Sequence, residues 1–167
     1  MRPQWFGDSF DIVKRFFACV LSDAGFQLTI DGRYSGDWNG AESAFEAFVK
    51  PDRVANQRYS ALLIDPDTGI GRTRTEKHVT ITEIVGELSI FDLVFVFDQS
   101  FSRRESPKSQ MSQKLSEISR HGANAFYYDS HARFLFSSKE RSIIRLCKHL
   151  ILKSGLPTQR IYDSVEA

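Results

Sequence analysis

Two carboxylates at the end of a short apolar run are the residues of this chain best placed to do chemistry. Residues 61–64 are all apolar, Asp65-Pro-Asp67 follows them directly, and Gly69 comes two residues later. An apolar run of this length is typical of a buried strand. In open α/β sheets, ligands bind at the carboxyl ends of the strands. Asp65 and Asp67 are therefore the candidate catalytic residues.

The spacing of these two acids allows more than one role. Carboxylates two residues apart at a strand end can bind one divalent metal ion or one polarised donor group. Pro66 favours an extended backbone at Asp65. In the structural alternative, Asp67-Thr-Gly69 is only a turn and Asp65 accepts hydrogen bonds from backbone amides. Both interpretations stay open at the level of sequence.

Basic side chains follow the carboxylates and also the next apolar run. Arg72, Arg74 and Lys77 come after Asp67, and Arg103 and Arg104 come after residues 91–97. Two basic loops at one edge of a sheet suit a polyanion such as nucleic acid. The alternative is ordinary solvated surface charge.

A further polar group begins the first helical pattern of the chain. Asp8, Asp11 and Lys14 are spaced about one helical turn apart. Side chains at this spacing either pair with one another or bind a ligand together.

The bulk composition predicts one globular domain over residues 1–167. The net charge of +1 excludes a general DNA-coating protein, and the 41% hydrophobic content is that of a folded chain rather than a disordered one. No apolar stretch is long enough to span a membrane and no signal-peptide pattern is present, so the expected compartment is the cytoplasm, with no membrane partner. Cys19 and Cys147 lie among apolar neighbours and are expected to be free thiols. Histidine and cysteine spacing predicts no metal site of the zinc type.

The spacing of apolar residues predicts the helices and strands that must position these side chains. The chain alternates between helical and extended patterns, and the order strand, helix, strand across residues 61–97 predicts a parallel crossover. That crossover places the strand ends at Asp65 and Asp98 at one edge of the sheet. We expect an α/β domain with a mainly parallel sheet and a C-terminal antiparallel hairpin. The predicted helices are 9–24, 41–49, 80–88, 107–121 and 138–154, and the predicted strands are 26–30, 61–64, 91–97, 125–128 and 133–136.

Together, these segments resemble the Rossmann-like adenine-N6 methyltransferases, most closely the family that modifies adenine in large-subunit ribosomal RNA. That family begins with a Gly-Asn-x-x-Asp-Val-x-Lys helix, which is similar to residues 7–14 here. Its first strand ends in an aspartate and a glycine-rich loop, which residues 31–36 resemble. Its catalytic strand ends in Asp-Pro-Pro-Tyr, where this chain has Asp65-Pro-Asp-Thr68. The hairpin over 126–136 also has a counterpart in methyltransferase folds.

This resemblance implies a single three-layer Rossmann-like domain that uses S-adenosylmethionine and acts on nucleic acid. Asp65 would orient the target amine. Two differences from the family stand out. Asp67 and Thr68 replace the proline and the aromatic residue that help to hold a flipped base. Only one helix-length segment separates Asp31 from Asp65, so the strand that would bind the cofactor ribose is missing or remodelled. The implied cofactor-binding residues are Gly7, Asp8, Asp11, Lys14, Asp31 and Gly32.

Two other functions remain open. The second acid, Asp67, favours a nuclease or phosphohydrolase that binds Mg²⁺ or Mn²⁺ through Asp65 and Asp67. The Asp-x-Asp-x-Gly pattern also resembles topoisomerase-primase domains and haloacid-dehalogenase-type phosphatases. The missing cofactor strand favours a non-catalytic module that binds nucleic acid or a partner protein. The oligomeric state does not follow from the sequence.

Overall fold

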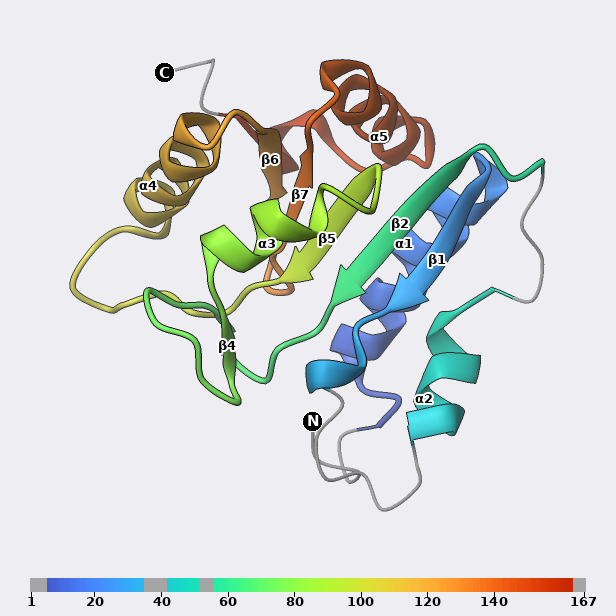
Figure 1. Ribbon diagram of the computed structural model, residues 1–167, viewed down its shortest axis with the longest axis horizontal. Helices are drawn as coiled ribbons and strands as arrows, with labels where there is room; N and C mark the ends of the chain where they lie inside the picture. Colours follow the sequence, from blue (N-terminus) through green and yellow to red (C-terminus); the bar gives the residue numbers. More distant parts are fainter. Residues whose placement is uncertain (1–5, 35–41, 52–55, 164–167) are drawn as a thin grey trace.

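A six-stranded sheet runs through the molecule, which is seen here in a computed structural model that describes residues 6–34, 42–51 and 56–163 (Figure 1). The strands lie in the order β1-β2-β5-β7-β6-β8. Neighbours β1, β2 and β5 are parallel, whereas β7 is antiparallel to both β5 and β6, and β8 is antiparallel to β6. The bounds are β1 Phe26–Ile30, β2 Tyr59–Ile64, β5 Leu93–Phe97, β6 Asn124–Tyr128, β7 Phe134–Ser138 and β8 Ile161–Tyr162.

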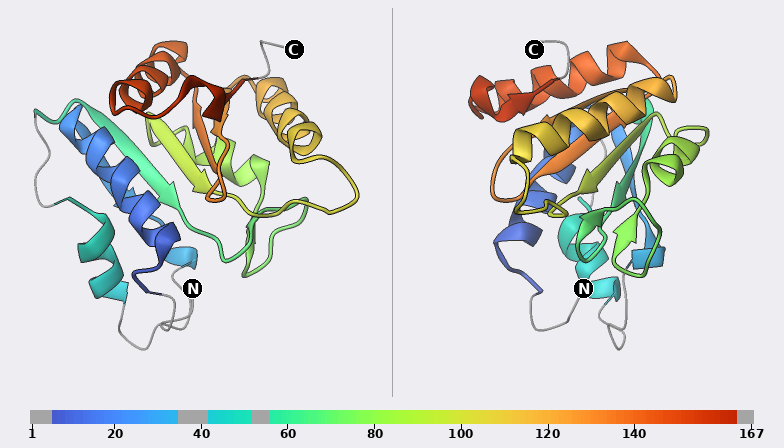
Figure 2. Two further views of the ribbon diagram at one scale, coloured as in Figure 1. Left: turned by 180° about the vertical axis from the view of Figure 1, so that it is seen from behind. Right: turned by 90° about the vertical axis from the view of Figure 1, so that its left-hand side faces the viewer.

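Helices cover both faces of this sheet, and each face has its own apolar core. Helices α1 (Ser9–Asp23), α2 (Glu42–Val49) and α5 (Arg141–Lys153) pack on one face. Helices α3 (Ile81–Glu87) and α4 (Pro107–Arg120) pack on the other. The right-hand view of Figure 2 shows α1 and α3 on opposite sides of the sheet. Such burial on both faces accounts for the almost wholly apolar strands β2 and β5.

Aromatic side chains hold the antiparallel half of the sheet together. Phe136 in β7 lies opposite Phe95 on one side and Phe126 on the other. Its ring stacks on both, with centroids 5.7 Å from Phe95 and 4.9 Å from Phe126. Phe17 of α1 contacts the same ring edge to face at 5.2 Å. Cross-strand aromatic pairs of this kind stabilise a sheet and fix its register.

The structure confirms the α/β class, the parallel crossover and the C-terminal hairpin, and it corrects several boundaries. The predicted helix over 138–154 begins only at Arg141, because Ser138 is the last residue of β7 and its hydroxyl donates to the carbonyl of Asp92 at 2.6 Å. Strand β2 begins at Tyr59, two residues earlier than predicted. Residue 41, the predicted start of the second helix, lies outside the described residues.

The two cysteines lie within helices α1 and α5. Both Cys19 and Cys147 are free, as predicted, and burial raises the pKa of the Cys147 thiol to about 12. None of the helices in the described ranges has the length and apolar character needed to cross a membrane.

A small sheet at the carboxyl edge was not predicted. Strands β3 (Gly69–Ile70) and β4 (His78–Val79) pair in parallel directly after the Asp65 segment. The buried carboxylate of Asp98 anchors them, since it accepts from the Ile70 amide at 2.9 Å, Lys114 Nζ at 2.7 Å and the Tyr127 hydroxyl at 2.8 Å. Strands of two residues are too short for periodicity to reveal.

Gly69 packs so closely against Asp98 that a side chain does not fit. Its φ is +132°, and a Cβ there would lie 2.3 Å from Oδ1 of Asp98 and 2.8 Å from the Gln99 amide. We expect Gly69→Ala to lower the free energy of unfolding by about 2 kcal/mol or more, from backbone strain and from disruption of the Asp98 contacts. Urea unfolding measures this change.

The matched control is Gly86→Ala in α3. A Cβ at Gly86 meets nothing within 4 Å, so alanine should leave stability unchanged or raise it by up to about 1 kcal/mol. Equal stabilities for the two variants would contradict the tight packing at Gly69.

Candidate functional site

The start of α1 meets the end of β2, and a buried lysine joins them. Lys14 Nζ lies 2.7 Å from Oδ2 of Asp65 and 2.9 Å from Oδ1 of Asp11. Only 2% of the Lys14 side chain is exposed. Its ammonium also lies over the rings of Phe45 and Phe97, at 5.4 and 5.1 Å from their centroids. A cation so enclosed requires its two carboxylates, because the burial of an unpaired charge is costly.

Local sequence explains why α1 presents Lys14 in this way. Asp8 caps the helix by accepting from the amides of Phe10 and Asp11 at 2.8 and 3.1 Å. Gly7, at φ +81°, turns the chain so that its own amide donates to Oδ2 of Asp11 at 2.9 Å. Both oxygens of Asp11 are thus occupied inside the protein. Of these N-terminal residues, Asp11 and Lys14 form an ion pair of the kind that their spacing predicts.

Burial and pairing act against each other on the ionisable groups of this cluster. Burial raises the pKa of Asp65 above its ordinary value, and the neighbouring Lys14 opposes this only in part. Burial alone would lower the pKa of Lys14, but the carboxylates of Asp65 and Asp11 outweigh it and the pKa is raised. Perturbed groups beside a cavity are candidates for a functional site.

A cavity of about 530 Å³ opens beside the cluster. Its walls come from the start of α1 and from the ends of β2 and β5. Asp67, at the rim, is exposed, and Oδ1 of Asp65 has no hydrogen-bond partner in the described part of the chain. This cavity, called the Asp65 pocket below, is lined by Asp8, Phe10, Asp11, Lys14, Asp65, Asp67, Phe97 and Gln99.

The structure therefore brings together five of the residues predicted from sequence, namely Asp8, Asp11, Lys14, Asp65 and Asp67, around one cavity. Gly7 contributes through its amide to Asp11. Sequence reasoning missed Phe10, Phe97 and Gln99. Phe10 and Phe97 pack edge to face at 5.2 Å and form the apolar wall. Their positions follow from helix rotation and strand register, which the sequence pattern does not specify to this precision.

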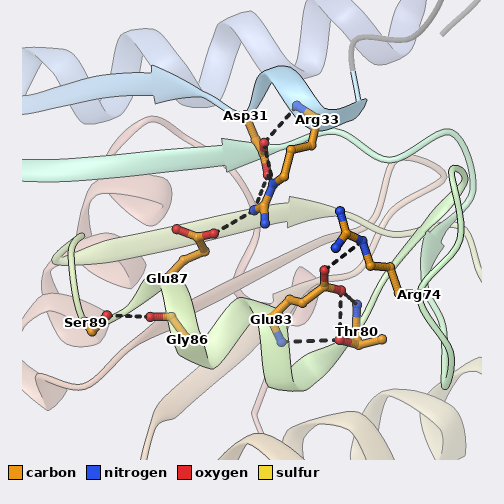
Figure 3. Close-up of polar contacts among 8 residues, drawn as sticks. All are labelled: Asp31, Arg33, Arg74, Thr80, Glu83, Gly86, Glu87 and Ser89. Atoms are coloured by element: carbon orange, nitrogen blue, oxygen red, sulfur yellow. Dashed lines mark hydrogen bonds and ion pairs between the residues drawn. The ribbon is translucent and has the colours of Figure 1, made fainter.

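Asp31 and Gly32 lie elsewhere. They belong to a separate cavity of about 430 Å³, at the end of β1. Arg33 donates to both oxygens of Asp31 and reaches Glu87 of α3 at 2.7 Å (Figure 3). Asp31 is thereby held by a residue two positions along the chain. Gly36 of the predicted cofactor loop lies outside the described residues.

The predicted basic residues divide into three groups. Arg74 pairs with Glu83 at 3.1 Å, next to the capping box that Glu83 forms with Thr80 (Figure 3). Arg72 and Arg104 line a groove between α3 and α4. Lys77 and Arg103 are exposed. No member of the set lines the Asp65 pocket.

In the segments that the structure describes, no group of three or more histidine, cysteine, aspartate or glutamate side chains is arranged to hold a metal ion. Comparison of the chain with protein-family models, with curated proteins and with solved structures gives no significant match.

Removal of Lys14 should test the cluster. We expect Lys14→Met to lower the free energy of unfolding by about 3–5 kcal/mol, because two buried carboxylates lose their common partner. Asp65→Asn, which leaves the contact between Lys14 and Asp11, should cost less, about 1–3 kcal/mol. In urea unfolding, the double variant should lose at least about 1 kcal/mol less free energy of unfolding than the two single variants lose together. Strict additivity would contradict the direct contact.

Alkaline pH should destabilise the protein. Burial and Asp98 raise the pKa of Tyr127, and the pKa of Lys14 is also raised. Both groups hold their protons more tightly in the folded state. The Lys14 contribution is therefore intact below its ordinary value of 10.5 and is lost as the pH rises through the raised folded value. The free energy of unfolding in urea should stay level from pH 8 to about pH 10 and fall between there and pH 12, and Tyr127→Phe should give a shallower fall. A profile that stays level up to pH 12 would contradict the shifts.

Proposed function

We propose that the protein is a methyltransferase-related enzyme that binds S-adenosylmethionine in the Asp65 pocket and acts on nucleic acid. One observation carries this proposal. Residues 7–14 and Asp65, two separate motifs of the resemblance, meet in space. Lys14 and Asp65 are 51 positions apart, yet their side chains are in contact at 2.7 Å beside one cavity.

The residues of the pocket fit such a cofactor. A volume of about 530 Å³ lies within the range of small-molecule and cofactor sites. The rings of Phe10 and Phe97 offer apolar surface to an adenosine. The exposed carboxylate of Asp67 lies at the rim of the pocket, where it would attract the positively charged sulfonium of the cofactor.

The chemistry assigned to Asp65 follows from its surroundings. When bound, S-adenosylmethionine supplies an electrophilic methyl group. Oδ2 of Asp65 is held by Lys14, so Oδ1 would accept a hydrogen bond from the target amine. Because burial raises the pKa of Asp65, its carboxylate takes up a proton more readily than an exposed aspartate does. Lys14 would act by fixing the orientation of that carboxylate.

The fold is compatible with a Rossmann-like assignment in its central part. Strands β1, β2 and β5 are parallel, and the antiparallel hairpin β6–β7 lies next to β5. Among the described residues, β1 is an edge strand, so no further strand is available there to hold the cofactor ribose. Binding would depend on the start of α1 instead.

The metal-dependent alternative is less favoured by the geometry. The Lys14 ammonium already lies 2.7 Å from Asp65, and a divalent ion on the same carboxylate would lie close to this buried cation. The Asp65 pocket also argues against the non-catalytic alternative, which assumes that the cofactor site has been lost.

Calorimetry with S-adenosylmethionine tests the proposal. We expect wild-type protein to give saturable heat, and Asp67→Lys to weaken the affinity at least about tenfold, because a cation at the rim opposes a cationic ligand. Asp67 is exposed, so the variant should fold normally.

The matched control is Glu76→Lys, the same charge reversal at an exposed residue that does not line the pocket. Its affinity should equal that of the wild type. No heat or thermal shift with wild-type protein at millimolar ligand would rule out the proposed function.

Transfer of a radiolabelled methyl group to adenine-containing RNA tests the chemistry itself. We expect activity in the wild type and at least about a hundredfold loss in Asp65→Ala. At saturating S-adenosylmethionine, activity should be retained in Asp67→Asn and in the presence of a chelator. RNA cleavage that requires Mg²⁺ and is lost in Asp67→Asn would instead support the metal-dependent alternative. Thermal unfolding of each variant controls for folding.

A further inference from the structure

A second, larger cavity lies between α4 and the start of α3, on the face of the sheet opposite α1. Figure 1 shows the positions of these two helices. Its volume is about 980 Å³. Side chains along α4 line it from Ser109 to Arg120, the last residue of that helix. Since α4 has 14 residues, the cavity follows a helix roughly 20 Å long. We call this cavity the α3–α4 groove.

Three arginines bring unpaired positive charge to the groove. Arg72 follows β3, Arg104 lies in the loop between β5 and α4, and Arg120 ends α4. In the described segments, none of the three guanidinium groups has a carboxylate partner. Lys114 also lines the groove, but its ammonium is held by Asp98. The acidic side chains there are Glu105 and Glu117, so a net positive charge remains.

The remaining groove face of α4 is neutral and rich in hydrogen-bonding groups. Hydroxyl and amide side chains repeat along the helix at spacings of three or four residues, while its apolar residues are buried against the sheet. Serine and glutamine side chains are common hydrogen-bond donors to phosphate oxygens. The groove side chains of this kind on α4 are Ser109, Gln110, Ser112, Gln113 and Ser116. Both glutamine amides donate within the protein, and Ser112 bonds the Tyr162 hydroxyl. Among the described residues of this set, the hydroxyls of Ser109 and Ser116 are therefore the ones free to donate to a ligand.

The groove and the Asp65 pocket open at the same edge of the sheet. Gln99 lines the pocket, and the next residue, Ser100, lines the groove. Likewise Asp67 lies at the pocket rim, while Ile70 of the following strand lines the groove. The two cavities therefore share the segments that follow β2 and β5, at the carboxyl edge of the sheet.

We propose that the α3–α4 groove binds the phosphodiester backbone of single-stranded nucleic acid. Arg104 and Arg120 lie near the two ends of α4, and with Arg72 they leave the groove one positive charge in excess of Glu105 and Glu117. Arginines separated by the length of a helix, with hydroxyl donors between them, suit a chain of regularly spaced phosphates. Delivery of the bound nucleic acid to Asp65 rests on the proposed function, whereas binding in the groove does not.

Fluorescence anisotropy with a labelled single-stranded RNA tests this inference. We expect Arg104→Ala/Arg120→Ala to weaken binding at least about tenfold and to reduce the slope of log K against log salt by about 1.4, since each phosphate contact on a single strand contributes about 0.7. Both arginines are exposed, so the variant should fold.

The matched control is Arg141→Ala/Arg145→Ala, which removes the same charge from a separate cavity between α4 and α5. Binding and salt slope should stay close to those of the wild type. An equal loss in both double variants would overturn the inference, because net charge alone would then explain the binding. Absence of RNA binding by the wild type, or equal competition by poly-glutamate at the same charge concentration, would overturn it as well.

Calorimetry on the same variants separates this inference from the proposed function. Arg104→Ala/Arg120→Ala should bind S-adenosylmethionine as the wild type does. If the cofactor fails to bind any form while the groove variant loses RNA, the proposed function fails and the groove inference stands. If the cofactor binds and the groove variant keeps full RNA affinity, the groove inference fails alone.

Discussion

The buried ammonium of Lys14 is the contact on which the site depends. Lys14 must be paired, because a lone cation with 2% of its side chain exposed would be strongly unfavourable. Its partners come from two separate parts of the chain, Asp11 on its own helix and Asp65 at the end of β2. The need to compensate one charge thus fixes the start of α1 against the carboxyl edge of the sheet. The Asp65 pocket lies in the angle between these elements.

Two aspartates at the ends of adjacent strands, Asp98 and Asp65, differ in their hydrogen-bond partners. Asp98, at the end of β5, accepts hydrogen bonds from two backbone amides, a lysine and a tyrosine. Asp65, at the end of the adjacent strand β2, accepts only from Lys14 among the residues that the structure describes. Both are buried, and Asp65 lines the Asp65 pocket. Asp98 holds the β3–β4 segment in place, and in the proposed function Asp65 uses its second oxygen to bind a ligand.

Most of the fold could be predicted because its signals are local. The capping residue Asp8 and the apolar spacing along α1 predicted both ends of that helix to within one residue. The order strand, helix, strand predicted that β2 and β5 are parallel. The boundary at Arg141 was missed because Ser138 continues the β7 ladder, a tertiary effect that overrides the helical pattern.

The site was predictable only in part, for a physical reason. Sequence spacing identifies which acids and lysines lie at the ends of elements, but contact between Lys14 and Asp65 depends on how α1 is rotated on the sheet. Asp31 illustrates the opposite case, since it follows β1, lies outside the Asp65 pocket and is bound locally by Arg33. The groove arginines could be noted as basic, but their common cavity required the packing of α3 against α4.

A crystal structure of the protein with S-adenosylhomocysteine is the most direct test of a cofactor site at the Asp65 pocket. We expect ligand density in this pocket, with the adenosine against Phe10 and Phe97 and with Asp65 still paired to Lys14. Density elsewhere, for example at Asp31, or an empty Asp65 pocket at saturating ligand, would contradict it.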